Sequence, residues 1–188
     1  MKSMTKRLLA ALLAVAALFA LVGCSKSDKA DAAPKDYTKI LHDARPDEDN
    51  EYYMIFSPGE DGKFTAQYGY SASYDAAQLD EEIRNMLLPL LNLEEDMYTD
   101  FAASVSGMMV QSYGIAIVKP AEGKQQAVSE ALDAYVQSQM QSMEHYLEDQ
   151  YQIAASSHIS TAPTGEVILV CCENPEAVMN AIKTALSA

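Results

Sequence analysis

The feature that most constrains this chain is a continuous apolar run, Leu8–Leu21, that follows three basic residues, Lys2, Lys6 and Arg7. Positive charge followed by an apolar segment is typical of a secretory signal peptide. As a helix, the run would be about 21 Å long at about 1.5 Å per residue, which is too short to cross a hydrocarbon core of about 30 Å. We therefore expect a cleavable export signal rather than a membrane span, so that only the residues after it build a domain.

The apolar run ends in Leu21, Val22, Gly23 and Cys24. These residues resemble the lipobox of bacterial lipoproteins, in which a small residue admits the signal peptidase and the cysteine thiol receives a diacylglyceryl group. Two acyl chains anchor stably, because burial contributes about 0.8 kcal/mol per CH₂ group and one chain binds only marginally. The resemblance implies a lipoprotein signal peptide at residues 1–23 and lipid on Cys24. The alternative is an ordinary secretory signal in which this cysteine has no role.

Export would place the chain on the outer face of the bacterial cytoplasmic membrane, and its charge limits what it can contact there. Cleavage before Cys24 removes three of the 13 basic residues, which leaves 10 against 27 acidic residues and a formal charge of −17. A surface this negative repels the phosphates of nucleic acids and anionic lipid headgroups. We therefore expect no nucleic acid partner, and membrane contact through the lipid anchor alone.

The composition changes along the mature chain and predicts three segments. Residues 24–35, rich in Ser, Lys, Asp and Ala, read as a lipidated flexible tether of roughly 18 Å average span. Residues 36–74 read as an N-terminal extension, with a short amphipathic helix from Tyr37 to Ala44 and a hairpin of strands near 52–56 and 64–70. Residues 75–188 read as the main domain.

In the main domain, amphipathic helices alternate with pairs of strands. The apolar spacing predicts an antiparallel α+β fold, with a mainly antiparallel sheet of four or more strands and helices packed on one face. The expected order is a helix capped by Asp75 and running to about Leu90, strands near 98–105 and 110–118, a long helix over 128–147, strands near 153–160 and 166–172, and a helix capped by Asn174.

Three stretches carry a resemblance to a known family: Tyr113–Pro120, Tyr146–Tyr151 and Val167–Val170. Together with the long helix, they look like a family of small lipoproteins, mostly from Gram-positive gut bacteria, built on a domain of unknown function. The likeness covers residues 75–187 and implies the fold and the location without an activity. The chain departs from the pattern at Asp149, where the family suggests a proline, so the local turn there differs.

Cysteine and histidine offer few sites for chemistry. Cys171 and Cys172 are adjacent on a predicted strand and should point to opposite faces as small, half-buried residues. A vicinal disulfide or a metal site is the alternative. His145 has Glu148 and Asp149 at helical spacing, which makes a metal site sterically possible, but a solvated helix face is the commoner arrangement. We therefore assign no catalytic residue, no metal ligand and no cofactor.

Two classes of function remain open. The favoured one is a non-catalytic lipoprotein that binds a small ligand or an envelope protein, for which the tyrosines Tyr53, Tyr68, Tyr70 and Tyr113 offer stacking surfaces. The alternative is an extracytoplasmic hydrolase that uses paired carboxylates. Acidic clusters that could supply them lie at residues 47–51, 80–82 and 94–96, although surface charge explains these clusters equally well.

Overall fold

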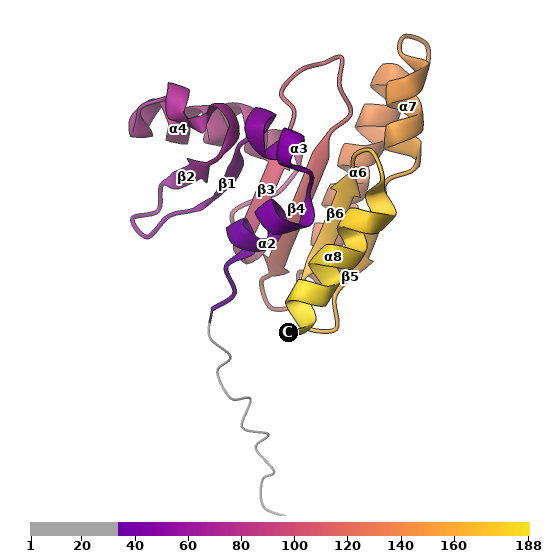
Figure 1. Cartoon of the computed structure of the whole chain (residues 1–188). Helices are drawn as coiled ribbons and strands as arrows, with labels where there is room; N and C mark the ends of the chain where they lie inside the picture. Colours follow the sequence, from indigo (N-terminus) through magenta and orange to yellow (C-terminus); the bar gives the residue numbers. More distant parts are fainter. Residues whose placement is uncertain (1–33) are drawn as a thin grey trace, which may run out of the picture. The chain divides into compact units, whose positions relative to one another are not determined.

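Within residues 34–188, the part of the chain that the computed structural model describes, six strands form one sheet in the order β2-β1-β3-β4-β6-β5 (Figure 1). Every neighbouring pair is antiparallel. The α+β class and the antiparallel sheet expected from the sequence are confirmed. The strands are β1 (Ile55–Pro58), β2 (Phe64–Gln67), β3 (Tyr98–Val105), β4 (Gly114–Pro120), β5 (His158–Thr161) and β6 (Val167–Cys171).

The central strands are apolar on both faces. In β4, Ile115 and Ile117 point to one face while Ala116 and Val118 point to the other, and all four side chains are fully buried. Because successive side chains of a strand alternate between faces, a strand without polar positions cannot leave either face in water. The sheet therefore needs helices on both sides.

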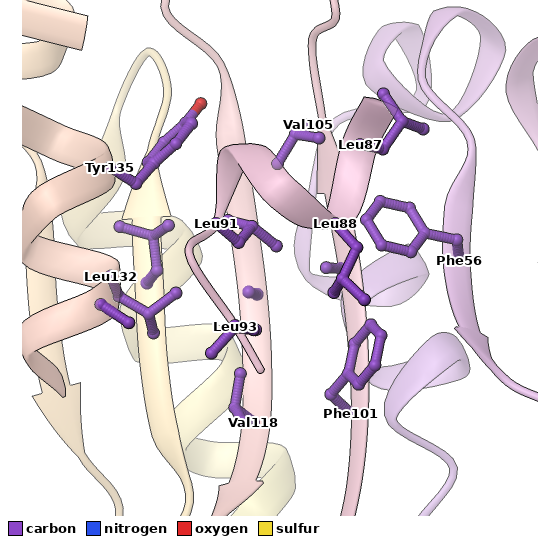
Figure 2. Packing of buried hydrophobic residues seen from close by; sticks show 14 of the residues in the cluster. Phe56, Leu87, Leu88, Leu91, Leu93, Phe101, Val105, Val118, Leu132 and Tyr135 are labelled. Carbon is purple, nitrogen blue, oxygen red and sulfur yellow. The ribbon is translucent and has the colours of Figure 1, made fainter. Parts of the chain in front are cut away.

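The first face is covered by helices from two parts of the chain. Figure 2 shows Leu132 and Tyr135 packing over one half of this face, and Leu87 and Leu88 packing near Phe56 over the other half. The elements that supply this cover are α4 (Ala76–Glu82), the π-helix η2 (Ile83–Leu87), α5 (Leu88–Leu90), α6 (Gln125–Met143) and α7 (Glu148–Ala155).

The second face is covered by α2 (Tyr37–Ala44) and α8 (Pro175–Ser187), which lie in front of the sheet in Figure 1. Leu41 and Ile182 are almost fully buried against the sheet here. The expectation that helices pack on one face is therefore corrected, because β4 and β6 have apolar side chains on both faces and require a second helical layer. Residues 36–74 belong to the same compact unit as the main domain, since α2 packs on the sheet and β1 pairs with β3.

The two ends of the sheet carry different residues, and we name them separately. We call the end where β4 finishes and β6 begins the base, and the end where β3 and β6 finish the apex. The described chain enters at the base, where the Lys35 ammonium donates to the Leu186 carbonyl and lies 4.0 Å from the Glu166 carboxylate. The Tyr37 hydroxyl donates to the same carboxylate over 3.0 Å. Burial raises the pKa of Glu166, but hydrogen bonds from Thr164, its own backbone and Tyr37 outweigh it and lower the pKa.

Most elements expected from the sequence are present, with shifted bounds. Strand β3 matches its predicted limits, whereas β4 begins at Gly114 rather than near residue 110. The strand expected over 153–160 is wrong in its first half, because residues up to Ala155 form helix α7 and only β5 is extended. Asn174 precedes α8 as predicted, but it has φ of +55° and makes no side-chain capping bond. The acidic run at 47–51 is helical, in α3 (Asp47–Tyr52).

The predicted signal peptide, the lipobox Leu21–Cys24 and nearly all of the tether lie outside the described residues. The same holds for the lipid attachment expected at Cys24.

Gly114 tests how tightly α6 packs on the sheet. A Cβ at this position would lie 2.6 Å from the Tyr135 hydroxyl oxygen and 2.7 Å from its ring, so Gly114→Ala must displace the buried tyrosine. We expect a loss of about 1–3 kcal/mol in the free energy of unfolding, measured by urea denaturation. Gly107→Ala is the matched control, because its nearest neighbour would be an ordinary 3.6 Å away. Equal stability of the two variants would contradict this packing.

Candidate functional site

A cleft of about 550 Å³ opens at the apex, and its walls are mostly tyrosine and methionine. This volume lies within the range of about 300–1,000 Å³ that is common for small-molecule sites. Much of the apolar surface is open to solvent, since Tyr52 is 69% exposed, Met86 57% and Met108 58%. The lining residues are Tyr52, Tyr53, Tyr70, Tyr74, Glu82, Met86, Ser106, Gly107, Met108 and Gln111.

One wall of the cleft depends on a close approach of two backbones. The short 3₁₀ helix η1 (Gly69–Ser73) packs beside α3, and Gly69 lies on the backbone of the residues that lead into β1. A Cβ on Gly69 would be 2.5 Å from the Tyr53 carbonyl carbon and 2.6 Å from the Met54 nitrogen, and its φ is +50°. Only glycine meets both conditions without strain. The contact sets Tyr70 beside Tyr53 in the cleft.

The opposite wall depends on the π-helix η2. A π-turn widens the hydrogen-bonded repeat from four to five residues, which rotates all later side chains around the helix. Ile83 and Leu87 stay buried on the sheet, and the buried positions continue at Leu88 and Leu91. Met86 is within the π-turn, is exposed and lines the cleft, although its spacing of three residues from Ile83 predicts a place on the buried face.

Behind the cleft, a buried arginine links several elements of the second face through hydrogen bonds. The Tyr53 ring stacks on Tyr113 with centroids 3.8 Å apart, and the Arg45 guanidinium donates to the Tyr113 hydroxyl over 3.2 Å. Arg45 is only 5% exposed, and it also donates to the Ser104 hydroxyl at 2.6 Å, the Asn50 side-chain oxygen at 2.7 Å and the Tyr53 carbonyl at 2.6 Å. One side chain therefore joins α2, α3, β3 and the two stacked tyrosines.

A smaller polar pocket of about 230 Å³ adjoins the cleft, with Tyr53 and Gln111 in both linings. Burial raises the pKa of the Asp49 carboxyl here, and a hydrogen bond from Tyr113 only partly opposes this effect. Ser112 also lines the pocket, and its buried hydroxyl has no hydrogen-bond partner within residues 34–188. Burial raises the pKa of the Cys172 thiol to about 12, so this cysteine is no nucleophile near neutral pH.

The charged residues that line the cleft and the polar pocket are all acidic. Neither lining contains Lys or Arg, whereas Glu82 lies in the cleft, and Glu48, Asp49 and Glu173 line the polar pocket. Burial raises the pKa of Tyr70, and Tyr74 and Glu82 raise it further, so the ring is neutral at pH 7. The site thus offers neutral aromatic faces beside carboxylates.

Not all of the sequence-based candidates gather at this site. Tyr53 and Tyr70 line the cleft, and Tyr113 is buried behind it, but Tyr68 lies against His42 with ring centroids 4.2 Å apart. Cys171 and Cys172 are free and buried in the clusters on opposite faces of the sheet, as their alternation predicted.

The histidine and carboxylate candidates are mostly scattered over the surface. The His145 side chain is 90% exposed in the turn after α6, and its closest carboxylate is Glu144 at 3.9 Å. Its proposed partners Glu148 and Asp149 begin a different helix, α7. Across the described residues, no three His, Cys, Asp or Glu side chains come together in a way that could hold a metal ion. No helix in the same range is long and apolar enough to span a membrane.

Sequence reasoning missed several residues of the site. Met86 and Met108 carry no pattern that separates them from core methionines, and tertiary structure alone leaves Tyr52 exposed and Tyr74 partly buried at the cleft. Arg45 gave one overlooked signal, because it is a lone basic residue between a helix and a proline, followed by a run of acidic residues.

Replacing Arg45 tests whether the network supports the site. Arg45→Met leaves the Ser104, Tyr113, Asn50 and Tyr53 acceptors without their donor, and we expect a loss of about 3–5 kcal/mol in the free energy of unfolding. Arg84→Met is the matched control, because that side chain is 39% exposed and its ion pairs contribute about 1 kcal/mol or less. Urea denaturation followed by circular dichroism measures both, and similar losses would refute the role given to Arg45.

Comparison with known proteins gives a family and no activity. No curated protein matches the chain. No solved structure matches it either. Residues 72–172 match the model of a family described as a domain of unknown function (DUF4358). This match covers more than half of the 188 residues and includes most of the region in which the sequence resembled such a family. The chain therefore belongs to the DUF4358 family.

Proposed function

We propose that this protein is a bacterial lipoprotein, held on the outer face of the cytoplasmic membrane by lipid on Cys24, that binds a small ligand in the cleft at its apex. The observation that carries the proposal is the polarity of the domain. The chain enters at the base through Lys35, next to Leu186 and Glu166, while the open tyrosine and methionine surface lies at the other end of the sheet. A tether from the base would leave this cleft facing away from the membrane.

The cleft itself supports binding rather than catalysis. Exposed apolar side chains in a concave site of this size are typical of ligand recognition, since their burial by a ligand is favourable. The two cysteines in the described part of the chain are buried thiols with raised pKa values, which removes them as nucleophiles.

The second candidate, a hydrolase, has one observation in its favour. Asp49 is a carboxyl group with a raised pKa in the polar pocket, where Glu48 and Glu173 also lie. A carboxyl of raised pKa beside others is the arrangement that acid–base catalysis uses. However, Asp49 already accepts a hydrogen bond from Tyr113, within the network that Arg45 organises, so we favour a structural role for it.

Fatty-acid labelling tests the anchor. Cells that express the full chain are grown with an alkyne analogue of palmitate, and the N-terminal peptide of the purified protein is examined by mass spectrometry. We expect label on wild type and no label on Cys24→Ala. Cys172→Ala is the matched control and keeps the label, because that thiol is buried in the folded domain. Label that persists in Cys24→Ala, or an unmodified N-terminal peptide in wild type, would refute the anchor.

Ligand-observed NMR tests the cleft, with benzyl alcohol and benzylamine as probes and the full chain in detergent micelles. We expect saturation transfer to at least one probe, and its loss in Tyr70→Ser, because this ring lines the cleft. Tyr146→Ser is the control, because Tyr146 is 74% exposed outside the cleft, and it keeps the signal. Transfer to neither probe, or equal signals from both variants, would contradict a binding cleft.

A further inference from the structure

The cleft surrounds one carboxylate with aromatic rings. Tyr53, Tyr70 and Tyr74 line it together with Glu82, and the rings of Tyr70 and Tyr74 lie 6.1 Å apart at an angle of 50°. Both Tyr74 and Glu82 are close enough to Tyr70 to act on its hydroxyl. One face of Tyr53 is stacked on Tyr113, and its other face and the rings of Tyr70 and Tyr74 are the aromatic surfaces that the cleft can offer to a cation.

Glu82 has no partner that explains its position. It is half-buried, and among residues 34–188 it takes part in no ion pair and no side-chain hydrogen bond. By contrast, the neighbouring Asp80 on the same helix accepts from the Phe64 backbone over 2.7 Å and pairs with Arg84. A half-buried carboxylate without a counter-charge leaves room for a positive group from outside the chain.

No Lys or Arg side chain lines the cleft. Lys35, Lys119 and Lys124 are at the base, and Arg84 points to Gly62, Asp80 and Glu95. Arg45 does not line the cleft, but it lies behind the wall, where it donates to the Tyr53 carbonyl over 2.6 Å and acts as a counter-charge for Asp49. Glu82 is the carboxylate inside the cleft, and its charge favours a positive ligand over an anion.

The charge and the size of the cleft also limit which molecules can occupy it. A second copy of the chain would bring another surface with a large acidic excess against this one, which is unfavourable. The volume of about 550 Å³ suits a molecule of a few to some tens of heavy atoms rather than a folded partner.

We propose, building on the binding function above, that the cleft takes a small organic cation, an amine or quaternary ammonium compound, held by the faces of Tyr53, Tyr70 and Tyr74 and by the Glu82 carboxylate. The cation lies against the rings, and Glu82 provides the balancing charge. Met86 and Met108 contact the apolar part of the ligand at the mouth of the cleft.

Isothermal titration calorimetry on the full chain in a non-ionic detergent tests this proposal with a matched pair of probes. Choline and 3,3-dimethylbutan-1-ol have nearly the same shape, and only choline carries a charge. We expect choline to bind at least about fivefold more tightly than the neutral alcohol. Glu82→Gln should remove most of this preference, because it keeps the shape of the side chain and removes its charge.

Two further variants separate the aromatic contribution from folding. Tyr70→Phe keeps the ring and should bind choline within about twofold of wild type, whereas Tyr70→Leu should lose about fivefold or more. Glu81→Gln controls for a general loss of negative charge, since Glu81 is exposed on the same helix outside the cleft, and it should leave choline binding unchanged. Circular dichroism verifies that each variant is folded.

The outcomes distinguish this inference from the binding function on which it rests. Equal affinity for choline and the neutral alcohol, or a preference unchanged in Glu82→Gln, would overturn the cation site and leave a cleft for apolar ligands. Binding of trilysine without binding of choline would assign the site to basic peptides and overturn a small organic cation. If choline, the alcohol and the benzyl probes all fail to bind, both proposals are wrong.

Discussion

Burial of the central strands on both faces is the constraint on which the rest of this structure depends. Strand β6 and most of β3 and β4 are buried, with apolar side chains on both faces, so each face must be covered. Helices α6, α4 and their continuations cover one face, and α2 and α8 cover the other. One of the covering helices, α2, precedes the region that matches the family. The N-terminal segment is therefore part of the folded domain.

That second layer also explains why the apex carries a site. Packing of α2 on the sheet brings Arg45 to the end of the helix, where it can reach Ser104 on β3 and Tyr113 before β4. The guanidinium fixes Tyr53 from behind through its carbonyl and through the stacked Tyr113 ring. These contacts preorganise the tyrosine wall, which reduces the entropy that is lost when a ligand binds.

The sequence was informative where local chemistry decides structure and uninformative where tertiary packing does. Asp75 and Gln78 form the expected capping box, and β3 ends where its alternation of side chains predicts. The π-turn in η2, within which Met86 lines the cleft, has no recognisable signal in the sequence. The last residues of α7, from Ile153 to Ala155, were expected to begin a strand, because the short helix leaves only Ala154 fully buried. The tyrosines were identified as a class, but which of them meet depended on the turn at Gly69.

The placement of charge along the sheet connects the two proposals. At the base, Lys35 and Lys124 are paired with acidic groups, Glu166 and Asp96, so this end of the sheet carries both signs. At the apex, Glu82 lies beside aromatic rings without such a partner among the described residues. If charge served only to keep the domain dispersed, exposed carboxylates would be enough. A carboxylate retained among tyrosines at the apex is better explained by a positively charged ligand.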